Sequence, residues 1–138
     1  LLDVLENYFD IVFIDFPKLL IKFLFPETIK EIDKFVFISE PNYISAFNLN
    51  ELLGLMNHKD LDIDLDIAIN KYNLRPSISP SGLNNYLSYP VKAFIPYDRD
   101  IEFLFLNKGP SSIFKYNLRI VKSIRDLSNS IHGDIGIE

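Results

Sequence analysis

Four short apolar runs, separated by segments with helical periodicity, constrain the fold of this chain more than any other feature. The runs are bulky, end at polar or turn-forming residues, and span 11–15, 35–39, 65–69 and 91–95. Such runs are typical of strands that are buried on both faces of a parallel sheet. The intervening segments predict helices at 27–33, 43–56, 81–87, 99–107 and 113–131. Strands that alternate with helices predict an α/β domain with a mostly parallel sheet and helices on both faces.

Length and composition favour a single soluble domain. The chain has 138 residues, of which 48% are apolar, so residues 1–138 are expected to form one α/β domain with a substantial core. The most apolar region is interrupted by Lys18, Lys22, Glu27 and Lys30, and no membrane-spanning segment is predicted. The chain contains no cysteine, which excludes thiolate metal sites and fits a cytoplasmic protein.

Charge gives little support for nucleic-acid binding. The net charge is −5, and acidic side chains predominate in the first half of the chain. The candidate basic stripe has four members on the last predicted helix, namely Lys115, Arg119, Lys122 and Arg125. Basic residues at helical spacing usually form a solvated face, so nucleic acid is not an expected partner.

Several motifs of metal and nucleotide sites are missing or incomplete. Residues 60–67 read DLDIDLDI, but they lack the glycine and the final glutamate of an EF-hand loop, so they are interpreted as the solvated entry to the third strand. His58 and His132 are far apart in the sequence and are expected at the surface. No glycine-rich phosphate loop or nucleophile elbow is present.

Asp15 ends the first apolar run and has two interpretations. Ligand sites of open α/β sheets lie at the carboxyl ends of the strands, so the position suits a functional carboxylate. Aspartate and proline also simply end strands and turn the chain, and the Asp15–Pro17 segment fits that interpretation as well.

The order of the strand-ending motifs resembles the carboxyl-terminal half of the MinD/ParA family of P-loop ATPases. The resemblance covers about residues 8–131 and is closest to the branch that contains the pilus-assembly proteins TadZ and CpaE. The motifs are Asp15-Phe-Pro17, Ser39-Glu-Pro41 with Ser45, Ile69-Asn70-Lys71-Tyr72, Ile95-Pro96-Tyr97-Asp98 and Asn107-Lys-Gly109. Each motif is short, and the specificity comes from their order and spacing.

The resemblance implies a nucleotide site with ATP and Mg²⁺ as cofactors. Asp15 would match the Walker B aspartate, close to the metal and the attacking water, as the catalytic and metal-site residue. Phe16 and Pro17 would begin the segment that senses the γ-phosphate. Asn70 would match the asparagine that reads adenine, and its amide offers both a donor and an acceptor. Pro96, Tyr97 and Asp98 would form the loop on the other side of the base.

The sequence also departs from the family. The family's Walker A loop and its phosphate-binding lysine are absent, so the chain is expected to be the carboxyl-terminal part of a larger ATPase domain and to be inactive alone. Lys18 follows Pro17 where MinD has small residues, which favours the pilus branch or a degenerate member. The implied function is the positioning of a pilus, secretion or division machine through ATP-dependent homodimerisation. Its partners would be proteins of a membrane-associated machine, which could recruit it to the inner membrane.

Two alternatives remain open from the sequence. The chain could be a pseudo-ATPase or interaction scaffold that keeps the fold without nucleotide turnover. It could also be a flavodoxin-like or receiver-like domain in which Asp15 and Lys71 form part of an acidic pocket, although the second acid of a receiver pocket is not evident.

Overall fold

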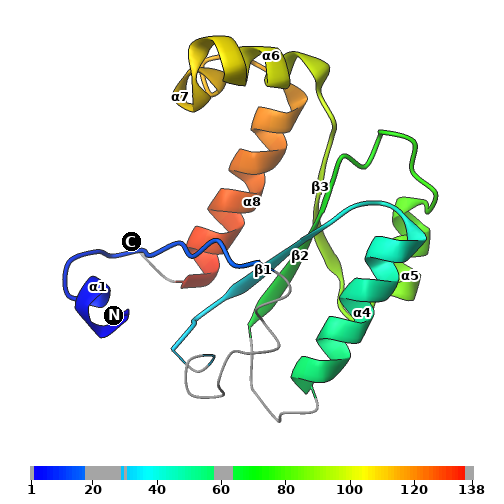
Figure 1. Cartoon of the computed structure of the whole chain (residues 1–138), viewed down its shortest axis with the longest axis horizontal. Coiled ribbons are helices and arrows are strands. Elements are labelled where there is room, and N and C mark those ends of the chain that lie inside the picture. The colour runs from blue at the N-terminus through cyan, green and yellow to red at the C-terminus, as the bar shows by residue number, and fades with distance from the viewer. Residues whose placement is uncertain (1, 18–28, 30, 58–63, 136–138) are drawn as a thin grey trace.

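A parallel three-stranded sheet forms the centre of the molecule. The computed structural model describes residues 2–17, 29, 31–57 and 64–135. The strands are β1 (Phe35–Ser39), β2 (Leu65–Asn70) and β3 (Val91–Ile95), in the order β1-β2-β3 (Figure 1). The predicted α/β class is confirmed, and three of the four predicted strands occur where the apolar runs lie.

The register of the strands brings their carboxyl ends to one edge of the sheet. Phe35 pairs with Leu65 and Ser39 pairs with Ile69, in parallel. On the other side of β2, Asn70 pairs with Ile95 after an irregularity between Ile67 and Ala68. The loops that follow the three strands are therefore neighbours, which is the requirement for a site built from several loops.

Helices lie on both faces of the sheet, as predicted. The connections α4 (Tyr43–Asn57) and α5 (Pro80–Tyr86) lie on one face, and α8 (Arg119–Ile135) lies on the other and packs against β3 (Figure 1). Parallel strands that follow one another in order place right-handed crossovers on the same side, which explains the shared face of α4 and α5. The remaining helices are α1 (Leu2–Glu6), α6 (Arg99–Lys108) and α7 (Pro110–Ile113).

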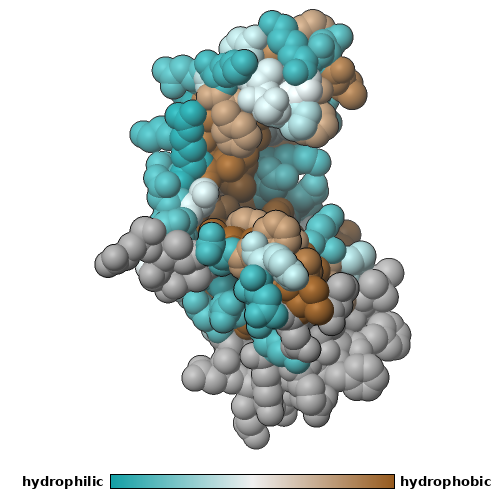
Figure 2. Space-filling view, turned by 90° about the vertical axis from the view of Figure 1, so that its left-hand side faces the viewer, coloured by the Kyte–Doolittle hydropathy of each residue, from teal (hydrophilic) through white to brown (hydrophobic). Residues whose placement is uncertain are grey.

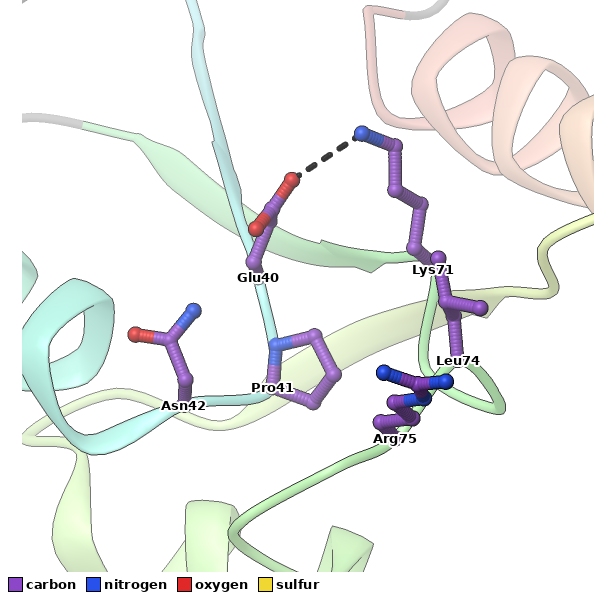
Figure 3. A pocket seen from close by; sticks show the side chains of 6 residues that line it. All are labelled: Glu40, Pro41, Asn42, Lys71, Leu74 and Arg75. Carbon is purple, nitrogen blue, oxygen red and sulfur yellow. Dashed lines mark hydrogen bonds and ion pairs between the residues drawn. The ribbon is translucent and has the colours of Figure 1, made fainter.

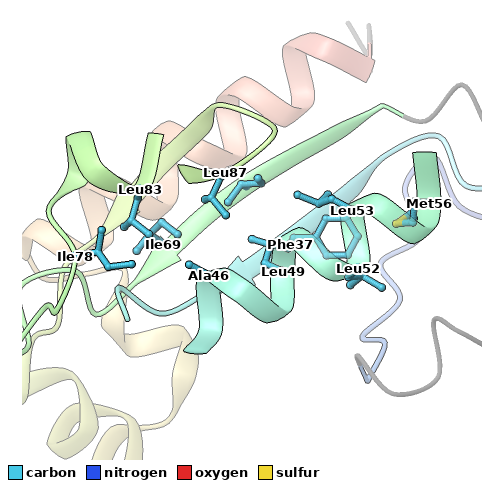
Figure 4. Close-up of a cluster of buried hydrophobic side chains, with 11 residues drawn as sticks. Phe37, Ala46, Leu49, Leu52, Leu53, Met56, Ile69, Ile78, Leu83 and Leu87 are labelled. Atoms are coloured by element: carbon cyan, nitrogen blue, oxygen red, sulfur yellow. The ribbon is translucent and has the colours of Figure 1, made fainter. Parts of the chain in front are cut away.

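The main core lies between the sheet and the α4/α5 layer. It is a cluster of buried side chains from β1, β2, α4, α5 and the loop before α5 (Figure 4). Its members are Phe37, Ala46, Leu49, Leu52, Leu53, Met56, Ile67, Ile69, Ile78, Leu83 and Leu87. A smaller cluster of Leu104, Ile113 and Val121 joins α6, α7 and α8. The first cluster thus fixes the loops after β1 and β2, and the second fixes the helices that follow β3.

The opposite face is less completely covered by the described residues. Val121 is the fully buried residue of α8, whereas Ile124, Leu127 and Ile131 are only half-buried. Figure 2, which views the left-hand side of Figure 1, shows a hollow with apolar surface between hydrophilic rims. Among the described helices, none is long and apolar enough to cross a membrane.

The prediction of a first strand at 11–15 is wrong. Residues 11–17 form neither helix nor strand, and the side chains of Ile11, Val12, Phe13 and Ile14 are all exposed. A strand requires a hydrogen-bonded neighbour, and in the described part of the chain β1 pairs only with β2. Of this segment, Phe16 is the residue that packs against the main core. The apolar run therefore indicated a segment that could form a strand, but residues 11–15 pair with no strand in this structure.

Three smaller expectations also need correction. The predicted helix 113–131 is divided, because α7 ends at Ile113 and α8 begins at Arg119. The last helix also extends beyond its predicted end at Ile131, since α8 continues to Ile135. Of the predicted helix 27–33, Ile29 is helical and residues 31–33 are not, whereas residues 27, 28 and 30 lie outside the described residues, as do residues 60–63.

Asp66 corrects the interpretation of the DLDIDLDI segment. It lies within β2 and is buried, whereas Asp64, the other described aspartate of this segment, is exposed. The Lys34 ammonium lies 2.8 Å from the Asp64 carboxylate and 3.4 Å from that of Asp66, and Lys92 lies 3.9 Å from Asp66. Asp66 and Ala68 lie on the face of β2 opposite Ile67 and Ile69, and both are buried there. The alternation that predicted a solvated face here marks a buried ion cluster.

Candidate functional site

The loop after β2 begins with two of the candidate residues in a defined conformation. The Asn70 side-chain oxygen accepts a hydrogen bond from the backbone N–H of Lys71 at 2.9 Å. Lys71 itself has a left-handed backbone with φ of 57°, which is unusual for a residue with a side chain. The bond uses the acceptor of the Asn70 amide and leaves its NH₂ group to donate elsewhere.

Asn73 joins the loop after β2 to the loop after β3. Its side-chain NH₂ donates to the Tyr97 carbonyl at 3.2 Å, and its side-chain oxygen accepts from the Tyr97 backbone N–H. The backbone N–H of Tyr72 also donates to the Ile95 carbonyl at 3.3 Å. The two loops are therefore held together by an amide that satisfies both backbone groups of Tyr97.

The loop after β3 is held at both ends. Pro96 is buried, so it begins the loop from the core side. Asp98 is the N-cap of α6, and its carboxylate accepts a hydrogen bond from the Asp100 backbone N–H at 3.0 Å. Such a cap satisfies a free N–H of the first helical turn and fixes where the helix begins. Tyr97 lies between these two fixed points.

A small pocket lies between the loops after β1 and β2, at the same edge of the sheet (Figure 3). Its volume is about 200 Å³, and it is lined by Glu40, Pro41, Asn42, Lys71, Leu74 and Arg75. The Lys71 ammonium forms an ion pair with the Glu40 carboxylate at 3.1 Å. The Ser77 backbone N–H donates to the Pro41 carbonyl at 2.9 Å. These two contacts connect the walls of the pocket.

The structure brings together four of the five predicted site residues. Asn70, Pro96, Tyr97 and Asp98 all lie on the adjoining ends of β2 and β3. Asp15 is exposed in the segment without secondary structure, and no described residue forms a hydrogen bond or ion pair with it. Lys71 pairs with Glu40 rather than Asp15, so the receiver-like arrangement is not observed.

Sequence reasoning missed Asn73, and of the pocket residues it missed Asn42, Leu74 and Arg75. The available signal for Asn73 was its place three residues after the strand-ending Asn70, where polar side chains often bond to neighbouring backbone. Arg75 gave no such signal, because its left-handed backbone, with φ of 47°, is visible only in the structure. Among the described residues, no group of three or more histidine, aspartate or glutamate side chains could hold a metal ion.

Comparison with known proteins identifies the fold. No family model matches the sequence, and no curated protein matches it. Solved structures of ParA and MinD proteins do match. The ParA family ATPase of Chlorobium tepidum has a TM-score of 0.65 at 20% identity, over 74% of this chain and 43% of that chain. MinD of Aquifex aeolicus, in its complex with MinC, has a TM-score of 0.65 at 16% identity, over 77% and 45%.

A third match carries a bound nucleotide. MinD of Pyrococcus horikoshii, complexed with Mg-ADP, has a TM-score of 0.63 at 17% identity, over 77% of this chain and 44% of that chain. At these identities the likeness is one of fold, namely the P-loop NTPase-like α/β fold of the ParA and MinD structures. This chain spans less than half the length of these structures.

Proposed function

We propose that this chain is the base-binding, carboxyl-terminal part of an ATP-binding domain of the MinD/ParA type. The observation that supports the proposal most directly is the bridge from Asn73 to Tyr97, which joins the loop of Asn70 to the loop of residues 96–98. A nucleotide base needs a polar amide for recognition and a fixed loop to lie against. Both are available on one side of the sheet edge, on the fold shared with a MinD that is complexed with Mg-ADP.

The proposed base site assigns a different task to each residue. The Asn70 amide would donate through its NH₂ group to an acceptor nitrogen of adenine, while its oxygen accepts from Lys71. Pro96 and Tyr97 would form the wall against which the base lies. Asp98 would hold this wall in place without contacting the base, because its carboxylate caps α6 and so fixes the end of the loop.

Asp15 has the role of metal-site and catalytic carboxylate in this proposal. A carboxylate suits Mg²⁺, which prefers oxygen ligands and keeps several of its waters. The phosphate-binding loop would come from polypeptide outside these residues, because no glycine-rich phosphate loop occurs in the sequence. ATP and Mg²⁺ would then bind only to the longer protein, and the 138 residues would be inactive alone.

The cellular role that fits this proposal is the placement of a macromolecular machine. The longer protein would form an ATP-dependent homodimer and position a pilus, secretion or division apparatus, as a member of the TadZ/CpaE branch that the sequence resembles. Its partners would be proteins of that apparatus. A structural neighbour is a MinD protein in complex with MinC, which gives a precedent for a protein partner on this fold.

Calorimetric titration with magnesium-ATP tests the proposal. The titration is made on the 138-residue chain and on the polypeptide extended upstream in its gene. We expect binding only in the extended protein, and Asn70→Ala should weaken it. Asp15→Ala in that protein should abolish hydrolysis and leave the fold intact by circular dichroism. Normal turnover in the Asp15→Ala variant would remove Asp15 from the site.

A second candidate function is a scaffold without nucleotide turnover. The observation that favours it is the amount of exposed apolar surface, including Ile44 and Phe47 on α4 and Leu106 on α6. Such residues are typical of surfaces that contact other proteins when they form a patch. Absence of magnesium-ATP binding in both polypeptides would favour this scaffold over the ATPase.

A further inference from the structure

We infer that the pocket between the loops after β1 and β2 binds a phosphate group. This pocket is separate from the proposed base site, which lies between the loops after β2 and β3, and the inference does not depend on nucleotide binding there. The pocket is lined by two cationic side chains, Lys71 and Arg75, and by the amide side chain of Asn42, with the Lys71 ammonium directed to Glu40 (Figure 3). Guanidinium, ammonium and amide NH₂ groups are the donors that proteins use for phosphate oxygens.

The walls of the pocket are held in place by the surrounding structure. The Asn42 side-chain oxygen accepts from the Ser45 backbone N–H at 2.8 Å at the start of α4, so the amide oxygen is used and the NH₂ group remains a donor. The loop of Arg75 is tied to the loop of Asn42 through the Ser77–Pro41 hydrogen bond. The donors therefore come from two loops whose separation is fixed.

The two cations differ in their present partners. Lys71 is paired with Glu40 at 3.1 Å, and both side chains remain about half exposed. Arg75 forms no hydrogen bond or ion pair with any described residue, although it lines the pocket beside Pro41 (Figure 3). An arginine presents a planar fork of donors that matches phosphate oxygens, so an unpaired one beside a lysine is suited to an anion.

The backbone conformation of Lys71 and Arg75 also supports a phosphate site in this pocket. Lys71 and Arg75 are the two residues other than glycine that have positive φ among the described residues. Left-handed backbone is unfavourable for residues with a β-carbon, and it persists where the surrounding structure maintains it, frequently at ligand sites. In this chain both such positions carry a cation, and both cations line one pocket.

Size and charge specify the ligand class. A volume of about 200 Å³ holds a phosphate group but does not enclose a whole nucleotide. Glu40 lowers the positive charge of the empty pocket and holds Lys71 aside, so it competes with an incoming anion. The ligand is therefore either inorganic phosphate or the phosphate end of a larger molecule, which share the same recognition chemistry.

The experiment is a titration of the labelled 138-residue chain with inorganic phosphate, followed by amide chemical shifts. We expect saturable shifts at residues 40–42 and 71–75. Arg75→Ala should weaken binding by about tenfold or more, because a charged hydrogen-bond donor is lost. Glu40→Gln should strengthen binding by about two- to five-fold, because it removes the competing charge of an exposed pair. Arg99→Ala, an exposed arginine outside the pocket, should leave binding unchanged.

The outcomes separate the inference from its competitors. Shifts confined to the pocket, lost in Arg75→Ala and enlarged in Glu40→Gln, support the site. No saturable shift, equal binding in Arg75→Ala, or weaker binding in Glu40→Gln overturns it.

AMP and adenosine distinguish the sources of the phosphate. Competition by AMP but not adenosine assigns the pocket to a nucleotide phosphate, and phosphate binding without such competition assigns it to free phosphate. Adenosine shifts at Asn70 and Tyr97 report on the base site separately.

Discussion

Asp66 offers a sharp test of how the sheet is stabilised, because Asp64 provides a matched control two residues away. The side chain of Asp66 is 10% exposed and that of Asp64 is 56% exposed, yet both contact Lys34, whose own side chain is 5% exposed. The Asp66 Oδ2 atom has no hydrogen-bond donor, so its charge is balanced by the ammonium groups of Lys34 and Lys92. We predict that Asp66→Asn is strongly destabilising and that Asp64→Asn is not.

The expected magnitudes follow from burial. Removing one partner of a buried ion pair typically costs 3–5 kcal/mol, because the other charge remains buried without compensation. Since Lys34 keeps Asp64 as a partner, the expected cost of Asp66→Asn is at the lower end, about 3 kcal/mol. Asp64 is itself solvated, and Lys34 keeps Asp66 as a partner when Asp64 is replaced, so Asp64→Asn should cost about 1 kcal/mol. The difference between the variants should therefore be about 2 kcal/mol or more.

Urea unfolding followed by circular dichroism measures this difference as a shift of the midpoint at a constant slope. A double variant, Asp66→Leu with Lys34→Met, adds a second check. The double variant should lose less stability than Asp66→Leu alone, because it removes the Lys34 ammonium that Asp66→Leu would leave buried without the Asp66 carboxylate. Equal midpoints for Asp66→Asn and Asp64→Asn would refute the reasoning, since burial would then have no energetic consequence at this cluster.

Three further predictions concern the site, the core and the sheet edge. Asn73→Ala should cost about 1–3 kcal/mol for two lost hydrogen bonds and speed amide exchange at Tyr97, whereas Asn85→Ala, on the exposed side of α5, should change neither. Leu53→Ala, at a fully buried position, should cost about 2–5 kcal/mol in urea unfolding. Among the described residues β1 pairs only with β2, so its other edge should pair between copies of the chain; Ile38→Lys should reduce this self-association in sedimentation, and unchanged association would contradict pairing at that edge.

The sequence predicted the strands well where a strand has a partner in the described residues. The runs at 35–39 and 91–95 became β1 and β3 with the same bounds, and 65–69 gained only Asn70. The local apolar pattern is enough to predict these strands, because short runs of bulky side chains between turn residues seldom form other secondary structure. The run at 11–15 has the same pattern and forms no strand. An apolar pattern indicates that a segment can form a strand, but a strand forms only where a neighbouring strand is available for hydrogen bonding.

Burial of polar residues was less predictable for a related reason. The alternation around Asp66 is typical of a strand with one solvated face, but β2 is central in the sheet. What packs on a face of a sheet is a long-range property, so no local window could show that Asp66 is buried there. The same limit applies to Lys34, whose side chain is almost fully buried although lysine is rarely so.

The candidate site shows which part of a functional arrangement a sequence carries. Asn70 and the segment 96–98 were assigned through the resemblance to the MinD/ParA family, and their place at strand ends agrees with it because parallel strands bring their ends to one edge. The bridge from Asn73 to Tyr97 and the pocket of Arg75 depend instead on the course of the loop after β2, which bends back through left-handed backbone at Lys71 and Arg75. Residues with side chains rarely adopt that conformation, so no propensity argument would have placed it there. The parts of the site that sequence reasoning missed are thus those whose backbone departs from the usual preference, which is where ligand contacts are most often found.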